Sequence, residues 1–463
     1  MSKKTLWSGR FSKNPHRLAA SFSASVDFDR RLAFEDIEGS VAHVKMLASR
    51  KIISRKNANS ILKALSEVKK EIEKGSFPFR EEYEDIHLNI EKRVIEKIGD
   101  SGGMIHTARS RNDQVVLDER LYLRKQTAII LDGITDVADS AVMLAEKYFD
   151  AVMPLYTHLQ RAQPVLVSHH LLAYFEMLKR DRRRFEDCLK GINVNPLGAC
   201  AGAGTSFPVD RKMTAKLLGF PSVTANSIDT VSDRDFLVEF VFCCAALMGH
   251  LGRLCEELVL WSSKEFDFAD LGDGFTTGSS IMPQKRNPDI AELVRAKGSR
   301  VNGNLVSLLT LMKGLPLSYS RDMQEDKEPV FDTAQTVAES LPVFSEMLAG
   351  CKLKPENMRK SLEKGFVTAT DLADYMARAG MPFRKAHEVS GRIVAHAEKK
   401  GKNIEELTID EFRRFSPDIG ADIYKTVSID GSVKSKNSQG GTSHSQVKKM
   451  LRAARREVSG WRR

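Results

Sequence analysis

The sequence predicts a mainly α-helical protein whose centre is a bundle of long helices. Apolar residues recur with helical period over stretches of about 20–35 residues, far longer than the mean helix of about 12 residues. Segments of β-branched residues with alternating polarity, which would indicate strands, are scarce. Long helices of this kind indicate an elongated bundle, and we expect five of them, at residues 112–148, 165–190, 234–264, 287–313 and 332–348.

Composition and charge bound the possible functions. The chain has 463 residues, of which 42% are hydrophobic and 29% charged, as in a globular protein with a sizeable core. The net charge is +10, but lysine and arginine are dispersed rather than gathered in a stripe, so we expect no nucleic-acid partner. A general positive field would attract small anionic substrates, or it could serve solubility alone.

The cysteines and the apolar segments predict a cytoplasmic protein with no membrane partner. The six cysteines include no Cys-x-x-Cys pair, which fits buried free thiols in a reducing compartment. No apolar stretch follows the first charged residues, so we expect no signal peptide. The most apolar run, residues 236–260, should not span a bilayer because it is interrupted by Glu239, His250, Arg253, Glu256 and Glu257.

Three domains are predicted along the chain. Residues 1–108 form an N-terminal domain of shorter helices, expected at residues 33–50, 57–75 and 84–98. Residues 109–361 contain the bundle of long helices. After a break near Pro355, residues 362–463 form a small helical domain, in which a flexible polar stretch at 431–445 precedes a basic tail that begins as a helix.

The helix expected at residues 234–264 is apolar on almost every side. Phenylalanine, leucine and valine occupy so many of its positions that they cannot all face one neighbour. A helix of this kind must be enclosed all round. Either the rest of the same chain covers it, or helices of other subunits do, and the second arrangement is favoured.

The stretch from Gly278 to Asp289 is the most informative part of the chain. Residues 271–277 before it have the composition of a loop, and helical spacing returns after it. We expect Asn287 to be the helix N-cap, followed by acidic residues in the first turn. Two serine hydroxyls, Lys285 and a helix N-terminus suit the stabilisation of a developing oxyanion, although a solvated surface loop would have a similar composition.

Two further polar segments lie before long helices. In residues 106–114, two arginines, an asparagine and a threonine suit the recognition of a carboxylate, although a polar helix start capped by Ser110 or Asn112 would look the same. In residues 156–164, His158 lies in a polar linker before a helix that we expect to begin near Pro164. A lone histidine is more often structural than catalytic, so both interpretations of His158 stay open at this point.

These segments resemble a known family. Residues 278–288 match Gly-Ser-x-x-Met-Pro-x-Lys-x-Asn-Pro at every fixed position, which is the signature loop of the fumarase/aspartase superfamily. The pair Gln284-Lys285, together with the segments at 106–114 and 156–164, resembles the argininosuccinate lyase family in particular. The resemblance extends over essentially the whole chain, with mild departures at Arg286 and Lys385, where a second lysine and an acidic residue are usual.

The resemblance implies a fold, a reaction and an assembly. The fold would be the three-domain superfamily fold with a long central helical bundle. The reaction would be the reversible β-elimination of argininosuccinate to arginine and fumarate, the last step of arginine biosynthesis, by acid/base catalysis without a metal or another cofactor. The assembly would be a homotetramer whose helices form a common core, and each active site would combine segments from three subunits.

The resemblance also implies roles for individual residues. Ser279 would be the base at the succinyl carbon and His158 the acid at the departing guanidino nitrogen, and the opposite assignment stays open. Lys285 would stabilise the carbanion, and Glu292 would orient the histidine. The residues implied to bind substrate are Ser25, Arg111, Asn112, Thr157, Asn287, Tyr319, Gln324 and Lys327.

Two other functions remain to be separated from this one. A sibling enzyme would release fumarate from adenylosuccinate, from aspartate or from malate, but the arginine-containing segment and Gln284 argue against it. A structural protein derived from the enzyme, as in some eye lenses, would keep the fold without activity. The presence of Ser279, His158 and Lys285 argues against that second alternative.

Overall fold

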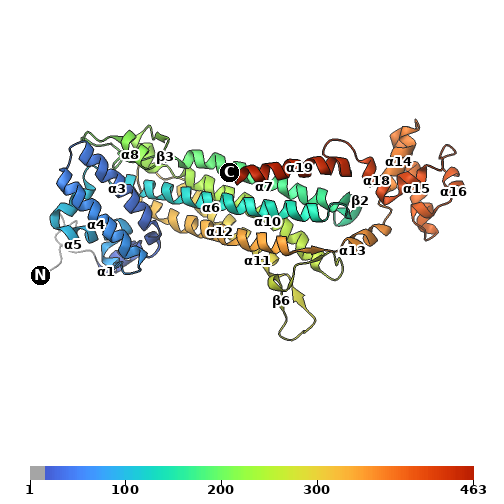
Figure 1. The fold of residues 1–463 in the computed structure, drawn as a ribbon, viewed down its shortest axis with the longest axis horizontal. Coiled ribbons are helices and arrows are strands. Elements are labelled where there is room, and N and C mark those ends of the chain that lie inside the picture. Colours follow the sequence, from blue (N-terminus) through green and yellow to red (C-terminus); the bar gives the residue numbers. More distant parts are fainter. Residues whose placement is uncertain (1–15, 463) are drawn as a thin grey trace. The chain divides into compact units, whose positions relative to one another are not determined.

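The computed structural model describes residues 16–462, and it confirms that the protein is mainly α-helical (Figure 1). The five long helices are α6 (Arg111–Lys147), α7 (Val167–Ile192), α10 (Asp235–Ser262), α11 (Asp289–Met312) and α12 (Lys327–Gly350). Within the described residues, the strands form separate two-stranded pairs. These strands are β1 (Val152–Thr157) with β2 (Gln160–Leu166), β3 (Val194–Asn195) with β4 (Ser222–Val223), β5 (Ala269–Asp270) with β8 (Lys352–Leu353), and β6 (Thr277–Gly278) with β7 (Arg286–Asn287).

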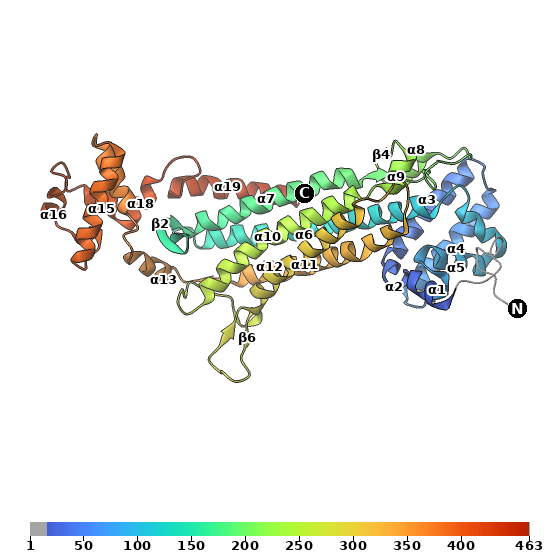
Figure 2. The same ribbon diagram turned by 180° about the vertical axis from the view of Figure 1, so that it is seen from behind.

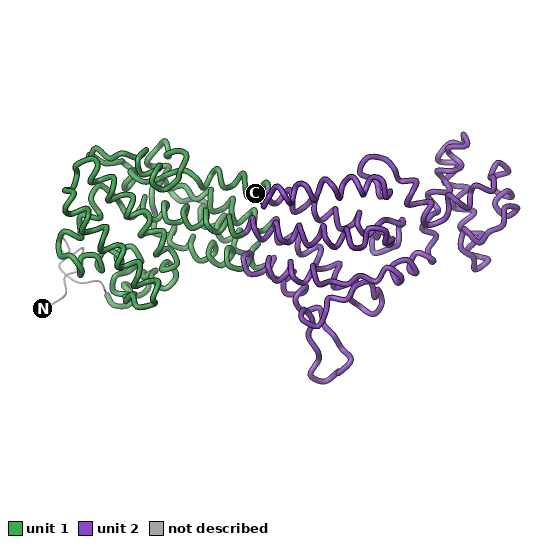
Figure 3. The backbone as a smooth tube through the Cα atoms, in the orientation of Figure 1, with its two compact units in different colours: residues 1–129, 183–245, 300–336 green, residues 130–182, 246–299, 337–463 purple. Residues whose placement is uncertain are grey.

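The chain divides into two compact units, and each of the five long helices has residues in both (Figure 3). Unit 1 comprises the residues up to 129 together with 183–245 and 300–336. Unit 2 comprises residues 130–182, 246–299 and those from 337 onward. The predicted division into three domains at residues 108 and 361 is based on helix lengths and breaks in the sequence, not on compactness, and it stays a prediction.

Unit 1 contains the N-terminal helices and one end of each long helix. Its shorter helices are α1 (Arg17–Ser23), α2 (Val26–Asp29), α3 (Ala33–Ser49), α4 (Arg55–Glu73), α5 (Ile86–Ile98), α8 (Arg211–Leu217) and α9 (Ser227–Ser232). Apolar residues at helical spacing on α3, α4 and α5 form one core, which includes the fully buried Leu47, Leu65 and Ile90. The helices begin where capping side chains predict, because Ser54 accepts from the Asn57 backbone N–H and Ser110 from that of Asn112.

Unit 2 contains the other end of each long helix and the C-terminal helices. The latter are α13 (Pro355–Lys360), α14 (Ala369–Arg378), α15 (Phe383–Lys399), α16 (Ile409–Arg413), α17 (Ile423–Val427), α18 (Ile429–Ser435) and α19 (His444–Trp461). Helices α14 to α17 share a separate apolar core around Leu372, Ile393 and Phe412. Helix α19 binds α6, since Arg455 pairs with Asp139 and Glu146.

Gly133 allows a close approach between α6 and α12 in unit 2. A Cβ atom at this position would lie 2.8 Å from Leu341 Cδ1 and 2.9 Å from Leu341 Cβ, well inside van der Waals contact. Replacing Gly133 by alanine is therefore expected to destabilise the protein by about 1 kcal/mol, because the overpacking outweighs the gain in helix propensity. Thermal unfolding measures this, and Gly391→Ala, in open space on α15, is the matched control that should raise stability instead.

Two predicted helix starts are wrong, and for the same reason. Pro164 lies in strand β2, so α7 begins at Val167. Asn287 is not the N-cap of α11, because it pairs with Thr277 in the β6–β7 ladder and the helix begins at Asp289. In both places a short strand continues to the edge of the helix, and strand pairing takes residues that local propensity assigns to the helix.

The polar stretch at 431–445 is more ordered than predicted. Its first part belongs to α18, where Ser432 and Val433 are fully buried. Asp371 of α14 holds this helix, since it accepts a 2.5 Å hydrogen bond from Ser432 and pairs with Lys436. The expected helical tail is confirmed as α19, which continues to Trp461.

Helix α10 is the most apolar helix of the described chain. By length and composition alone it could cross a membrane, and half of its most apolar stretch is buried inside the protein. The prediction that it is enclosed on every side is not met by the single chain, because Phe242 is 52% exposed while Phe240 and Val241 are fully buried. One face of α10 is thus open in the monomer.

Candidate active site

The signature loop of unit 2 is held at both of its ends. Strands β6 and β7 pair antiparallel, with Thr277 opposite Asn287, so residues 279–285 form the loop between them. The Thr277 hydroxyl donates to the carboxylate of Asp289, the first residue of α11. The strand pair therefore fixes the loop to the N-terminus of α11, while the loop itself projects away from the helices (Figure 1, beside β6).

Ser279 lies at the start of this loop, where two backbone N–H groups point at its hydroxyl. Its Oγ accepts from the N–H of Ile281 at 3.3 Å and from the N–H of Met282 at 3.1 Å. The loop closes with a hydrogen bond from the Lys285 N–H to the Met282 carbonyl, 3.0 Å long. Because hydrogen bonds to a charged oxygen favour its charged form, this arrangement would stabilise a serine alkoxide.

The other residues predicted for this part of the site lie at the end of the loop, in β7 and in α11. Lys285 is exposed, Asn287 is half-buried in β7, and Glu292 is half-buried in the first turn of α11. The acidic first turn predicted for this helix is confirmed. Ile281, at the outer part of the loop, is 82% exposed, although isoleucine is one of the residue types most often buried.

His158 lies at the tip of a tight hairpin in unit 2, not in a linker. Thr157 pairs with Gln160, so His158 and Leu159 are the only residues of the turn. Both have positive φ, 55° and 56°, as a type I′ turn requires, although glycine or asparagine usually takes such positions. Thr157, His158 and Leu159 are exposed, so the strained turn presents the imidazole at the surface of the chain.

In unit 1, Ser25 and Arg111 are both fixed to the N-terminus of α5. The Ser25 hydroxyl donates a 2.6 Å hydrogen bond to Asp29, whose other oxygen accepts from the Ile86 N–H at 3.0 Å. Arg111 binds Asp85, which also caps α5 by accepting from the backbone of its first turn. Burial raises the pKa of Asp29 to about 6, against the opposing charge of His87.

Arg321 and Glu84 connect the segment around Ser25 to residues 319–327, which include Tyr319, Gln324 and Lys327. Arg321 donates to the Ser23 carbonyl at 2.5 Å and pairs with the Glu84 carboxylate at 2.7 Å. Glu84 has φ 68° and ψ −63°, a strained conformation, and its carbonyl accepts from the Ser25 N–H at 2.8 Å. The strain at Glu84 thus helps to position the backbone of Ser25.

Lys327 belongs to a buried network of charges. Its Nζ lies 2.8 Å from Asp326 and 3.1 Å from Glu119, and Arg234 pairs with the same two carboxylates. Burial disfavours the Lys327 ammonium, but Asp326 and Glu119 outweigh it and raise the pKa of Lys327, so the group is charged. Tyr319 is 36% exposed beside this network, and burial raises its pKa.

Comparisons with known proteins agree along the whole chain. Residues 9–303 match the family described as Lyase, and residues 366–434 match the argininosuccinate lyase C-terminal family. The chain is 53% identical to the argininosuccinate lyase of Geotalea daltonii over 455 residues, which are 98% of this chain and 99% of the relative. It belongs to the argininosuccinate lyase family. The argininosuccinate lyase of Geobacter sulfurreducens is similar at 52% identity, again over 98% of this chain and 99% of the relative.

Solved structures show the same fold. An EDDS lyase in complex with formate has a TM-score of 0.87 at 29% identity, covering 96% of this chain and 89% of that protein. A class II fumarase from Schistosoma mansoni has a TM-score of 0.74 at 18% identity, covering 88% and 91%, and shares the fold alone. The superfamily fold with a long central helical bundle, which the signature loop predicted, is therefore confirmed.

The residues that the argininosuccinate lyase resemblance singled out fall into two groups. Unit 1 holds Ser25, Arg111, Asn112, Tyr319, Gln324 and Lys327, and unit 2 holds Thr157, His158, Ser279, Lys285, Asn287 and Glu292. Within unit 1, Ser25 and Arg111 converge on α5 through Asp29 and Asp85. Within unit 2, the hairpin tip and the signature loop lie at separate places (Figures 1 and 2, beside β2 and β6).

Several residues that hold these groups were not singled out from the sequence. Asp29, Glu84, Asp85 and Arg321 carry the contacts around Ser25 and Arg111. Only Asp85 had a local signal, because an aspartate next to the start of the helix expected at residues 84–98 is a candidate N-cap. Arg321 is 298 positions away from the carbonyl that it binds, and no local pattern predicts such a pairing.

Proposed function

We propose that this protein cleaves argininosuccinate reversibly to arginine and fumarate. The observation that carries the proposal is the geometry of Ser279, whose hydroxyl receives two backbone N–H groups on a loop anchored at a helix N-terminus. Membership of the argininosuccinate lyase family supports the choice of substrate.

The reaction demands the removal of a proton from a weak carbon acid. Ser279, as an alkoxide, takes the proton from the succinyl carbon next to a carboxylate, and the electron pair spreads into that carboxylate. Lys285 and the N-terminus of α11 stabilise the doubly charged group that results. The electron pair then forms the double bond of fumarate, the carbon–nitrogen bond breaks, and His158 protonates the departing guanidino nitrogen.

The substrate is an anion with several carboxylates, and unit 1 offers groups to bind it. Asp85 orients Arg111, whose guanidinium suits bidentate carboxylate recognition. Ser25 and Tyr319 supply hydroxyl groups, and Lys327 supplies a charged ammonium held by Asp326 and Glu119. We infer that Asn112, Thr157, Asn287 and Gln324 complete the binding site.

We also propose that the active sites are shared between subunits of a homotetramer. The monomer leaves large apolar side chains at least half exposed on α6, α10 and α11, namely Ile129, Met143, Phe242, Leu293, Val306 and Leu309. Exposed apolar surface along long helices is the kind that further helices cover. The exposed positions of His158 and Ile281 are explained if other subunits complete the site around them.

The test is direct, because fumarate absorbs in the ultraviolet. The purified protein is expected to release fumarate from argininosuccinate, and arginine in equal amount. Release from adenylosuccinate instead would make the protein a sibling lyase, and the absence of fumarate from either substrate, with a folded oligomer, would favour a structural role.

A further inference from the structure

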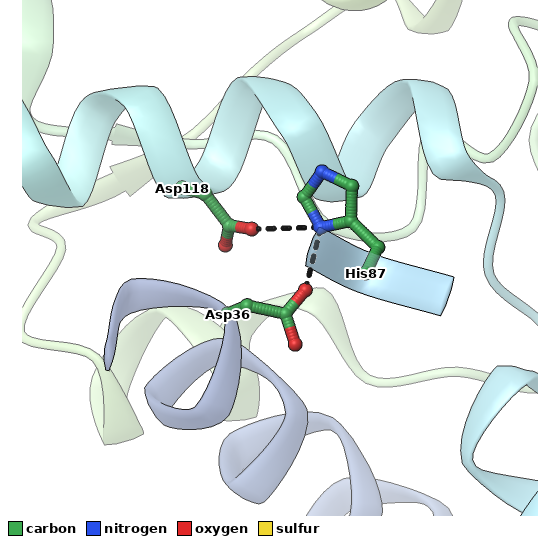
Figure 4. Close-up of side chains that lie close together, drawn as sticks. All are labelled: Asp36, His87 and Asp118. Atoms are coloured by element: carbon green, nitrogen blue, oxygen red, sulfur yellow. Dashed lines mark hydrogen bonds and ion pairs between the residues drawn. The ribbon is translucent and has the colours of Figure 1, made fainter. Parts of the chain in front are cut away.

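The core of unit 1 contains a histidine between two carboxylates that the proposed reaction does not use (Figure 4). Asp36 comes from α3, His87 from α5 and Asp118 from α6, and none is more than 3% exposed. His87 Nδ1 lies 2.6 Å from Asp36 Oδ2 and 3.3 Å from Asp118 Oδ2. The three groups therefore join three helices at one point.

The charge of the ring holds this cluster together. Burial disfavours a charged His87, but Asp118 and Asp36 more than offset it and raise its pKa to about 10. Burial would raise the pKa of Asp36, yet the contact with His87 outweighs it and lowers that pKa. Burial and the charge of Asp36 raise the pKa of Asp118 well above its ordinary value. His87 and Asp36 are consequently a buried ion pair at neutral pH, with Asp118 beside it.

The cluster is connected to the residues that precede and follow Arg111. The Gln114 side chain donates to Asp36 Oδ2 at 2.5 Å. Arg109 donates to the Ser40 hydroxyl at 3.0 Å, and that hydroxyl contacts the other oxygen of Asp36 at 3.4 Å. The polar segment at 106–114 thus has two roles. Arg109 and Gln114 bind the buried cluster, whereas Arg111 binds Asp85.

The same cluster also fixes the partner of Arg111. His87 is the second residue of α5 and lies two positions after the N-cap Asp85, which binds the Arg111 guanidinium. Asp118 lies seven residues after Arg111, about two turns along α6. A shift of α5 against α6 would therefore move Asp85 away from Arg111.

We propose that His87, clamped between Asp36 and Asp118, is a positioning residue that sets the Asp85–Arg111 pair for a carboxylate of the substrate. The proposal rests on the proposed function, because Arg111 is taken there to bind argininosuccinate. His87 itself touches no substrate and acts through the helices that it joins.

A bound cation is the competing explanation for such a cluster. One nitrogen of His87 and one oxygen from each aspartate lie within 4.8 Å of one another. However, Asp36 Oδ2 already faces both the Gln114 amide and the His87 ring, and the positively charged Arg109 is close by. The His87 ring and Arg109 supply the positive charge that a metal ion would otherwise provide.

The test compares His87→Gln, Asp36→Asn and the double variant. In His87→Gln the Asp36 carboxylate stays buried without its cation, so the KM for argininosuccinate is expected to rise about tenfold, with kcat changed less than about threefold. Asp36→Asn should have a smaller effect of the same kind. In the double variant both charges are gone, so KM should rise less than the product of the single effects. If His87→Gln does not fold, the double variant and Asp36→Asn carry the comparison.

The control is His170→Gln in unit 2, because His170 also pairs with a carboxylate, Glu257, at 2.6 Å. This variant should leave KM unchanged. The proposal is overturned if KM stays at the wild-type value while the melting temperature falls, or if the single effects on KM multiply. It is also overturned if the wild type binds one equivalent of zinc that Asp36→Asn does not bind.

The clamp and the proposed function can fail separately. If the wild type releases no fumarate, the proposed function is wrong. The melting temperatures of the same variants then test whether His87 and Asp36 form an ion pair. A double variant that melts well above His87→Gln supports an ion pair between the two residues, and additive losses contradict it.

Discussion

Ser279→Ala is expected to lower kcat for argininosuccinate cleavage by about 10²–10⁴-fold, the usual loss when a general acid or base is removed. The reason is that the Ser279 oxygen is the atom at which the Ile281 and Met282 N–H groups converge. Its removal takes away the proton acceptor that those groups would stabilise. Fumarate absorbance measures the rate, and KM should change little because alanine leaves Lys285 and Asn287 in place.

Ser280→Ala is the matched control for this result. Ser280 is the next residue on the same loop and is exposed, whereas the two N–H groups point at Ser279. We expect a loss of less than about tenfold from Ser280→Ala, within the range of a positioning effect. An equal loss in both variants would contradict the assignment of the base to Ser279 alone. Unchanged circular dichroism in both variants shows that a loss of rate is not a loss of fold.

The long helices could be predicted because their periodicity is strong and local. Helix α6 was expected at residues 112–148 and is Arg111–Lys147, and α10 was expected at 234–264 and is Asp235–Ser262. The hairpin around His158 was missed because residues 152–166 contain none of the Asn-Gly or Asp-Gly pairs that usually predict such a turn. The pairing of the two flanking strands continues to Thr157 and Gln160, which leaves only His158 and Leu159 for the turn and gives both a positive φ.

The candidate site could be predicted only in part, for a related reason. The signature loop and Ser279 belong to one contiguous motif, so the sequence alone was enough to predict them. The buried pair His87–Asp36 joins residues 51 positions apart, and Arg321 and Glu84 lie on different elements. Such contacts depend on how helices are placed in space, which local sequence patterns do not encode.

Mixing two inactive variants should restore activity if the active sites are shared between subunits. His158→Asn and Ser279→Ala each remove one of the two proposed proton-transfer groups. In a randomly assembled tetramer, about a quarter of the sites would take His158 from one chain and Ser279 from another, both intact. We therefore expect co-expressed variants, purified through two different tags, to recover roughly that fraction of wild-type activity.

The structure gives a specific reason to expect this recovery. The hairpin with His158 packs against α13 and α18, whereas the loop with Ser279 projects from β6 and β7 at the start of α11 (Figure 2). The matched control is the mixture of Ser279→Ala with Lys285→Ala. Both of these residues lie on one loop, so no mixed site contains an intact loop and no activity should return. No recovery in the first mixture, from a confirmed hetero-tetramer, would contradict shared active sites and place His158 and Ser279 of one site in the same chain. Recovery in the control mixture would contradict the assignment of Ser279 and Lys285 of one site to a single loop.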